Sequence, residues 1–489
     1  MPEITRRQFI QAAAAGSLAL AGLERPLFAA EKAGNKKPNL LFIWTDEQRA
    51  DTMAAYGNTK IRVPNLNRLA SESFVFKRAY VTQPVCTPSR CSVMTGLWPH
   101  ASGLFQNNIP LPKETKCLPE LLNNPAYRTG YMGKWHLGDE IFAQHGFEEW
   151  VSIEDIYWKH YTKVQDKEHA MSDYYYHLVS LGHKFEGRAA RKYAAKLPLE
   201  QSKPKFLERR ACDFLRRHRN EPFILYVNFL EPHMPFTGPF DNEYDPAYVD
   251  LPASFNTPLA DNEPETYRRK LKKIALEYGS DEQSFRKLIA RYWGLVTEVD
   301  TCVGGILNTL DELGLADNTL VVYTSDHGDM MGAHRLVAKS VMYEEAARIP
   351  WLMRVPWMGR KQHLVEQPVS HIDLVPTVLE LMGRKAQQGP QGQSLVPLMQ
   401  GGNAAQDHVF IEWNAETESD LNFPVRTVVS PDGWKLSLFK GDKSQLFNLK
   451  EDPGETKNLF DSGRHQDVIK RLTAKIRQWQ KKTKDTLEL

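Results

Sequence analysis

Several short segments of the chain are apolar at almost every position and lack the apolar–polar alternation of a half-buried strand. They are 39–45, 223–229, 319–325 and, less clearly, 349–355. This pattern is typical of strands buried on both faces. Between the second and third segments, apolar residues from Leu295 to Leu310 recur at helical spacing. Buried strands that alternate with helices along the chain predict an α/β fold: a large mixed, mostly parallel sheet flanked by helices.

Side chains of the types that bind metals or transfer protons follow three of these predicted strands. The clusters are Asp46-Glu47, Glu231-Pro232-His233 and Asp326-His327-Gly328. In open α/β sheets, ligands bind beyond the carboxyl ends of the strands. We therefore predict a functional site where the three clusters meet.

The segment Cys86-Thr87-Pro88-Ser89-Arg90 is the leading candidate for chemistry. Thr87 suits a helix cap and Pro88 the first helical position, so we predict a helix from Pro88 to about residue 95. Cys86 would lie just outside the positive end of this helix, with the charge of Arg90 beside it. On these grounds Cys86 is either a nucleophile next to an anion site or a buried cysteine before a helix.

The composition changes between about 383 and 402, where Gly, Gln and Pro are frequent, and we interpret this stretch as a connector. Short β-like runs follow at 409–413 and 434–439, and an amphipathic helix is expected from about 467 to 482. We predict a catalytic domain over 37–383 and a smaller α+β subdomain over 384–489, with an antiparallel sheet and a helix. The stretch 157–219 is expected to be an insertion near the sheet edge.

Residues 1–30 have the organisation of an export signal. Arg6 and Arg7 precede a weakly apolar, alanine-rich run from Ile10 to about Leu23, which is too short to span a membrane. The paired arginines favour the twin-arginine route, which is mainly bacterial. An ordinary Sec signal and an uncleaved anchor are the alternatives. We expect a bacterial protein that is periplasmic or secreted, without stable membrane insertion.

The charge of the chain limits its classes of partner, and its cysteine content limits the disulfide bridges and zinc sites that it can form. The 62 Lys and Arg residues nearly balance the 60 Asp and Glu residues, so the net charge of +2 predicts no nucleic-acid partner. The five cysteines are scattered and form neither a disulfide framework nor the paired spacing of a zinc site. The sequence is compatible with one or two disulfide bridges.

Cys86-x-Pro88-Ser89-Arg90, followed by Thr95-Gly96, resembles the signature of the sulfatase family. Further segments match blocks of that family, in the usual order, along nearly the whole chain after the signal. They are 133–138, 231–235, 324–328, 339–345, 373–377 and 452–459. The resemblance implies an alkaline-phosphatase-like fold, hydrolysis of sulfate esters, and oxidation of Cys86 to formylglycine by a maturing enzyme.

By the same resemblance, the formylglycine is hydrated to a diol, and one hydroxyl attacks sulfur and expels the alcohol. Loss of a proton from the other hydroxyl then releases sulfate and restores the aldehyde. One divalent metal ion would be bound by Asp46, Glu47, the side chain derived from Cys86, Asp326 and His327. Glu47 and His327 depart from the Asp and Asn of many members. Oxygen ligands favour Ca²⁺, whereas an imidazole suits softer ions, and Mn²⁺ and Mg²⁺ are the alternatives. Glu47 would either bind the metal or lie beside it.

The resemblance also implies roles for the charged and titratable side chains. Arg90 and Lys134 would hold the diol and the sulfate oxygens, and His136 would be the base that completes the reaction. His233 and Lys339 would lie on the leaving-group side, where a proton donor is needed because an alkoxide leaves poorly.

An exported enzyme meets substrates outside the cytoplasm, so we expect a sulfated sugar or glycan as the substrate. A phosphonate or phosphate ester hydrolase of the same superfamily is one alternative, which the histidine at position 327 allows. A non-catalytic glycan-binding homologue is the other. Against it stands the joint presence of six residues: Cys86, Arg90, Lys134, His136, His233 and Lys339.

Overall fold

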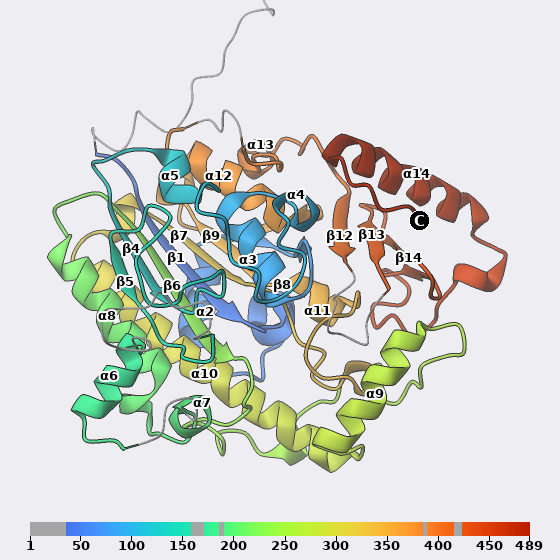
Figure 1. The fold of residues 1–489 in the computed structure, drawn as a ribbon, viewed down its shortest axis with the longest axis horizontal. Helices are drawn as coiled ribbons and strands as arrows, with labels where there is room; N and C mark the ends of the chain where they lie inside the picture. The colour runs from blue at the N-terminus through green and yellow to red at the C-terminus, as the bar shows by residue number, and fades with distance from the viewer. Residues whose placement is uncertain (1–35, 158–170, 185–189, 385–388, 415–422) are drawn as a thin grey trace, which may run out of the picture. The chain divides into compact units, whose positions relative to one another are not determined.

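The computed structural model describes residues 36–157, 171–184, 190–384, 389–414 and 423–489, so the predicted signal 1–30 lies outside the described residues. Residues Lys36–Leu489 form one compact unit. Its central sheet has eight strands (Figure 1). Their order is β10 (His363–Val365), β2 (Phe74–Phe76), β9 (Trp351–Arg354), β7 (Thr319–Ser325), β1 (Asn39–Asp46), β6 (Phe223–Pro232), β4 (Arg128–Gly133) and β5 (Glu149–Val151).

The predicted mixed, mostly parallel sheet is confirmed, because only β9 runs antiparallel to its two neighbours, β2 and β7. The three clearest predicted strands are β1, β6 and β7, which lie side by side at its centre. The segment predicted at 349–355 divides between β9 and β8 (Arg348–Ile349). Pro350 separates the two, since it has no N–H for a strand ladder. β8 joins β3 (Ala79–Tyr80) and β11 (Val369–Ser370) in a small second sheet.

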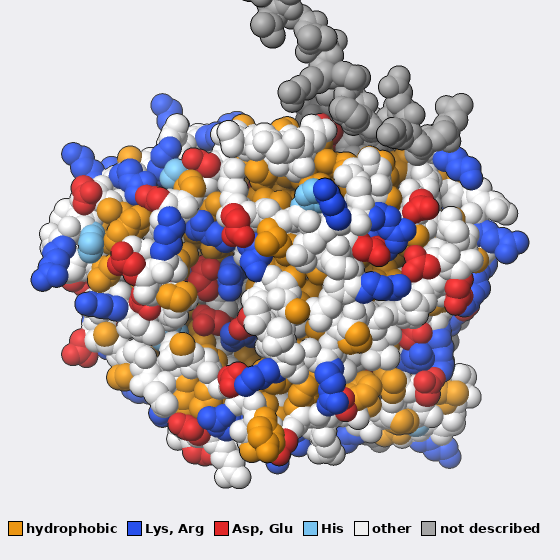
Figure 2. All heavy atoms as spheres, turned by 180° about the vertical axis from the view of Figure 1, so that it is seen from behind, with side chains coloured by type: hydrophobic (Ala, Val, Ile, Leu, Met, Phe, Trp, Pro, Cys, Tyr) orange, Lys and Arg blue, Asp and Glu red, His pale blue; other side chains and the backbone are white. Residues whose placement is uncertain are grey.

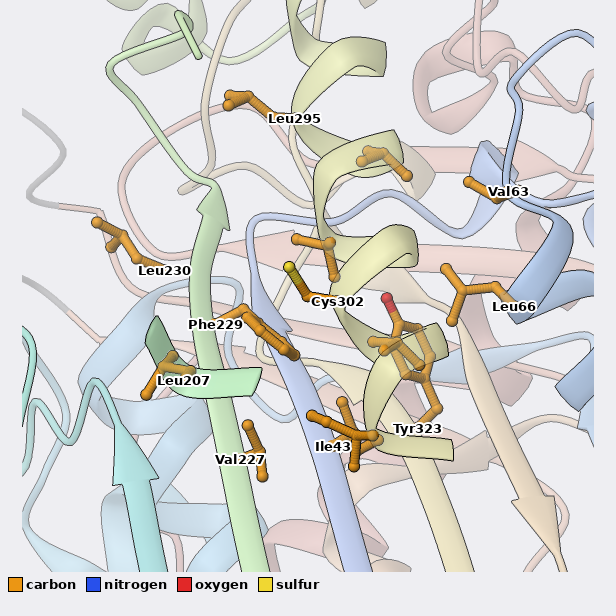
Figure 3. Packing of buried hydrophobic residues seen from close by; sticks show 14 of the residues in the cluster. Ile43, Val63, Leu66, Leu207, Val227, Phe229, Leu230, Leu295, Cys302 and Tyr323 are labelled. Carbon is orange, nitrogen blue, oxygen red and sulfur yellow. The ribbon is translucent and has the colours of Figure 1, made fainter. Parts of the chain in front are cut away.

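The central strands lack polar alternation because each of their faces is covered by helices. Leu41 and Ile43 of β1 belong to one apolar core with α2 (Pro64–Ser71), α8 (Lys203–Arg217) and α10 (Glu282–Glu312), whose packing is shown in Figure 3. Leu40 and Phe42 belong to a second core with α3 (Cys86–Thr95), α5 (Leu118–Leu122) and α12 (Leu374–Leu381). Successive side chains of a strand point to opposite faces, so both sets must be apolar.

The expectation that 157–219 is an insertion near the sheet edge is wrong for its second part. Helix α8 packs against α10 and β6 and buries Phe206, Leu207, Phe214 and Leu215 in the first core. Its other face carries most of its Lys and Arg residues, which hid the apolar periodicity of this segment. The first part holds α6 (Asp173–Ser180) and α7 (Ala190–Ala194).

The C-terminal part contains the predicted antiparallel sheet and helix. The sheet consists of β12 (Val409–Trp413), β13 (Val425–Val429), β14 (Trp434–Phe439) and β15 (Gln445–Asn448). Helix α14 (Gln466–Thr483) covers one face, with Leu472 and Ile476 buried against it. The other face packs Val409 and Ile411 with Val85, the residue before Cys86. The boundary at 383/384 stays a prediction.

The remaining helices and the surface complete the fold. The helices are α4 (Pro99–Ser102), α9 (Glu265–Tyr278), α11 (Glu344–Ala347) and α13 (Val396–Met399). No helix in the described part of the chain has the length and apolar character needed to span a bilayer. All five cysteines are buried and unpaired. Basic and acidic side chains intermingle over the face shown in Figure 2, in line with the balanced charge of the sequence.

Candidate active site

Four adjacent strands end in one polar layer, as the clusters at the predicted strand ends led us to expect. Asp46 is the last residue of β1, Asp326 follows β7, and His233 follows β6. Lys134 and His136 follow β4. The parallel registers of β7, β1, β6 and β4 bring these ends to the same edge of the sheet. The structure thus gathers the predicted site residues in one region, and their roles stay predictions.

Helix α3 begins at Cys86, two residues earlier than predicted. Val85, in an extended conformation, occupies the cap position. The hydroxyl of Thr87 donates to the carbonyl oxygen of His136 at 2.9 Å instead of capping the helix. Local sequence cannot reveal this bond, because it joins two segments far apart in the chain. Cys86 therefore lies within the first turn, where backbone N–H groups have no acceptor inside the helix.

Arg90 is fully buried and joins α3 to the strand ends. Its Nε donates to Asp326 Oδ2 at 2.9 Å, and its Nη2 donates to Asp46 Oδ2 at 2.8 Å. Its Nη1 donates to the carbonyl oxygen of Lys134 and to Asn228 Oδ1, both at 2.8 Å. Charge-assisted bonds of this kind are short and strong. The guanidinium therefore holds the two carboxylates in a defined geometry next to Cys86.

Asp46, Cys86, Asp326 and His327 form a buried group whose candidate ligand atoms lie within 4.8 Å of one another. His327 Nδ1 is 2.9 Å from the carbonyl oxygen of Gly328, so Nδ1 carries the proton and Nε2 presents its lone pair to the group. Two carboxylates and one imidazole suit a divalent cation such as Ca²⁺, Mn²⁺ or Mg²⁺. These residues fit the metal ion that the sequence predicts.

Glu47 lies in a second group with Asp46 and His233. Its backbone is left-handed, with φ of 67°, and its N–H donates to Asp326 Oδ1 at 3.2 Å. Its carboxylate forms an ion pair with Lys339 and lies 3.7 Å from His233 Nε2. Its Oε2 is buried and has no hydrogen-bond partner among the residues that the structure describes. This oxygen is therefore available as a metal ligand. Whether Glu47 binds the metal or lies beside it stays a prediction from the sequence.

Burial and neighbouring charge act in different directions on the titratable groups. Burial alone would raise the pKa of the Asp46 carboxyl, but Lys134 and other cations hold that pKa well below its usual value. Burial raises the pKa of the Cys86 thiol, and the charge of Asp46 raises it further. Burial lowers the pKa of Lys339 to about 8 and that of His233 to about 3. The imidazole of His233 is therefore neutral, and the thiol of Cys86 stays protonated.

Sequence reasoning missed three polar residues that shape the site. Asn228 accepts from Arg90, and the Glu140 carboxylate accepts the backbone N–H of both Trp135 and His136. Asn108 Oδ1 lies 3.0 Å from His136 Nε2. Asn228 had a visible signal, because it is the amide within the apolar run 223–229. Asn108 and Glu140 had no such signal in the sequence, since their contacts with the loop that carries His136 are formed only by the folded chain.

Another cluster of candidate ligands, Cys117, Glu120 and His145, shares no residue with this site. Its first two members form a capping box at the start of α5, in which Glu120 Oε2 accepts the N–H of Cys117 at 3.0 Å. The box explains why these two side chains converge, so helix capping accounts for them without a bound ion.

Gly133, at the end of β4, places Lys134 and tolerates no side chain. Its φ is 119°, and a Cβ would overlap the carbonyl oxygen of Asn228. We expect Gly133→Ala to lower the free energy of unfolding by about 2–4 kcal/mol, measured by urea unfolding. Gly57, with φ of 102° and nothing within 4 Å of its Cβ position, is the matched control. Equal losses for Gly133→Ala and Gly57→Ala would show that backbone strain, and not the clash, sets the cost.

Comparison with known proteins identifies the family to which the chain belongs. Residues 38–384 match the sequence profile of the family described as Sulfatase, and residues 332–482 match that described as N-sulphoglucosamine sulphohydrolase, C-terminal. YidJ of Escherichia coli K12, described as an uncharacterized sulfatase, is 31% identical over 462 residues, which cover 92% of this chain and 88% of the relative. The N-acetylglucosamine-6-O-sulfatase of Bacteroides thetaiotaomicron is 26% identical, and the match covers 96% and 90% of the two chains.

Solved structures share the fold. A phosphonate monoester hydrolase from Silicibacter pomeroyi has a TM-score of 0.79 at 23% identity, with 92% of this chain and 96% of that chain covered. BT4656, in complex with its substrate D-glucosamine-2-N,6-O-disulfate, has a TM-score of 0.74 at 23% identity, with 92% and 99% covered. These likenesses confirm the expected alkaline-phosphatase-like fold. With the family match over most of its length, the chain belongs to the sulfatase family of sulfuric ester hydrolases.

Proposed function

We propose that this protein is an exported sulfatase that removes sulfate from a sugar or glycan, using formylglycine at residue 86 and one bound divalent metal ion. The observation that carries the proposal is the meeting of Cys86 with Arg90 and Lys134 at the buried ends of the central strands. A nucleophile position beside two buried cations and a carboxylate group is suited to attack on an anionic ester.

Asp46, Asp326, His327 and the side chain of residue 86 would hold the metal, with Glu47 at the edge of the group. When bound, a divalent cation supplies positive charge that lowers the pKa of a nearby hydroxyl and neutralises sulfate oxygens. The mainly oxygen donor set favours Ca²⁺, with Mn²⁺ and Mg²⁺, which also bind carboxylate oxygens, as alternatives.

The protein's own side chains would position the ester and move its protons. Formylglycine supplies a hydrated aldehyde in place of the thiol. Arg90 and Lys134 orient the sulfate oxygens, and His136 takes up a proton at a ring nitrogen after the alcohol has left. His233 Nδ1 lies 2.7 Å from the carbonyl oxygen of Met234, so Nε2 is the ring nitrogen on the side of Glu47. Because this imidazole is neutral and its proton lies on Nδ1, Lys339 Nζ would supply the proton to the leaving oxygen, and the lone pair of His233 Nε2 would accept a hydrogen bond on the same side.

Relatives and the N-terminal sequence support a sulfated sugar as the substrate. Proteins described as an N-acetylglucosamine-6-O-sulfatase and a Δ4,5-hexuronate-2-O-sulfatase match most of the chain. The pattern of residues 1–30 supports export to the periplasm or beyond by the twin-arginine route. Because that route carries folded proteins, oxidation of Cys86 by the maturing enzyme would precede export.

The phosphonate hydrolase alternative is favoured by the fold match to the Silicibacter pomeroyi enzyme and by His327. Sulfate, phosphate and phosphonate esters of the same phenol, assayed beside a panel of defined sulfated saccharides, distinguish a sulfatase from a phosphonate hydrolase. We expect kcat/KM for the sulfate ester to exceed that for the phosphonate by about 100-fold or more, with at least one saccharide cleaved. A phosphonate preference, or a panel with no cleaved saccharide, would contradict the proposal.

A further inference from the structure

The imidazole of His136 is held so that only one ring nitrogen is engaged. Nε2 lies 3.0 Å from Asn108 Oδ1. Nδ1 is buried and has no hydrogen-bond partner in the described part of the chain. The backbone of His136 is left-handed, with φ of 56°, and its N–H donates to Glu140 Oε1. The backbone of the loop that carries the ring is therefore fixed, and the contact of Nε2 with Asn108 sets the orientation of the ring.

Asn108 is anchored to the same loop through Thr87, the neighbour of Cys86. The Asn108 N–H donates to Thr87 Oγ1 at 3.2 Å, and that hydroxyl donates to the carbonyl oxygen of His136 at 2.9 Å. The backbone of Asn108 is itself left-handed, with φ of 65°. One hydroxyl thus fixes the backbones of both partners, which sets the side-chain amide of Asn108 against Nε2 of His136.

Tyr157 holds the face of the same imidazole. The two rings stack with centroids 4.0 Å apart and an interplanar angle of 21°. Lys134 Nζ lies 5.9 Å from the centre of the Tyr157 ring. Burial lowers the pKa of His136 well below its usual value, and the charges of Lys134 and Arg90 lower it further. The imidazole is thus neutral and carries one proton, whose place decides which nitrogen can act as a base.

We infer that Asn108 and Tyr157 are positioning residues that keep His136 as the Nε2–H tautomer, with Nδ1 as the base. The carbonyl oxygen of Asn108 accepts the Nε2 proton, so the lone pair lies on Nδ1. The opposite amide orientation would place the proton on Nδ1, where a buried N–H finds no acceptor among the residues that the structure describes and costs free energy. The inference rests on the proposed function, in which His136 takes up the proton released as sulfate leaves residue 86.

Substitutions at Asn108 test the tautomer in the full-length enzyme with residue 86 matured. Asp accepts hydrogen bonds but cannot donate when ionised, whereas Leu has a similar size and does neither. We expect Asn108→Leu to lower kcat by about 100-fold with a smaller change in KM, and Asn108→Asp to lose about tenfold at most. Asn108→Leu should also release one equivalent of phenol rapidly before slow turnover, because the base acts after the alcohol departs.

A second pair of variants tests the stacking. Tyr157→Ala should lower kcat by about tenfold, and Tyr157→Phe, which retains the ring, should lose less. Melting temperatures measured alongside identify any variant that fails to fold. The burst of Asn108→Leu is the signature that loss of structure alone does not produce.

His136→Ala separates the inference from the proposed function. It should show the same rapid release and slow turnover. If it shows no burst, the role proposed for His136 is wrong, whatever Asn108 does. If it shows the burst while Asn108→Leu keeps its kcat, or Asn108→Asp loses as much as Asn108→Leu, the positioning role of Asn108 is wrong.

Discussion

Cys86→Ala is expected to lower the turnover of a sulfate ester by about 10⁴-fold or more, because alanine lacks the thiol that the maturing enzyme would oxidise to the aldehyde. Binding of the ester by Arg90 and Lys134 would persist, so the loss should fall mainly on kcat. The effect is measured by steady-state rates of protein produced with a competent maturing enzyme. Peptide mass spectrometry across residue 86 of the unsubstituted protein should show an aldehyde in place of the thiol.

Cys91 provides the matched control for this variant. It lies on the same helix, is buried like Cys86, and its Sγ is 3.8 Å from Thr95 Oγ1. Cys91→Ala should lower stability by about 1–2 kcal/mol through a small cavity and leave most of the activity. Full activity of protein whose residue 86 is an unmodified cysteine would overturn the proposed chemistry, as would an active Cys86→Ala variant.

Arg90→Met is expected to lower the free energy of unfolding by about 3–5 kcal/mol, because it leaves two buried carboxylates without their shared cation. Asp46 and Asp326 accept two of the charge-assisted bonds of Arg90, and all three side chains are fully buried. Methionine fills a similar volume, so the change isolates charge from packing. Urea unfolding of the two proteins at neutral pH measures the loss, and activity should fall by about 10³-fold.

Arg128→Met is the control for the loss of an ion pair in general. Arg128 donates to Glu221 at 2.9 Å, but both side chains are more than two-fifths exposed. Exposed pairs contribute little, so this variant should change stability by less than about 1 kcal/mol. Similar losses for Arg90→Met and Arg128→Met would show that burial of the Asp46–Arg90–Asp326 network does not carry the stabilisation assigned to it.

Residues whose role is indicated by the adjacent positions in the sequence were predictable. The apolar runs at 39–45, 223–229 and 319–325 became β1, β6 and β7, because full burial on both faces requires apolar side chains at successive positions. Asp46, Asp326 and His327 were found as polar residues directly after such runs. The positions of parallel strand ends then predicted that they would meet.

Other features escaped because a distant partner changes what a local pattern means. Thr87 has a side chain suited to capping a helix, but its hydroxyl donates a hydrogen bond to the carbonyl oxygen of His136. Helix α8 was expected to belong to an insertion near the sheet edge, because its Lys and Arg residues conceal the apolar face that packs on α10. In both cases the deciding contact joins segments far apart in the chain.

The sequence by itself determined the kinds of chemistry available, their order along the chain, and which segments must be buried. Local periodicity and residue type carry that information directly. Only the tertiary structure decided that Asn108 faces His136, that Asn228 accepts from Arg90, and that Glu47 pairs with Lys339. Such contacts depend on the order of strands in the sheet and on the paths of the loops, and no short window of sequence contains either.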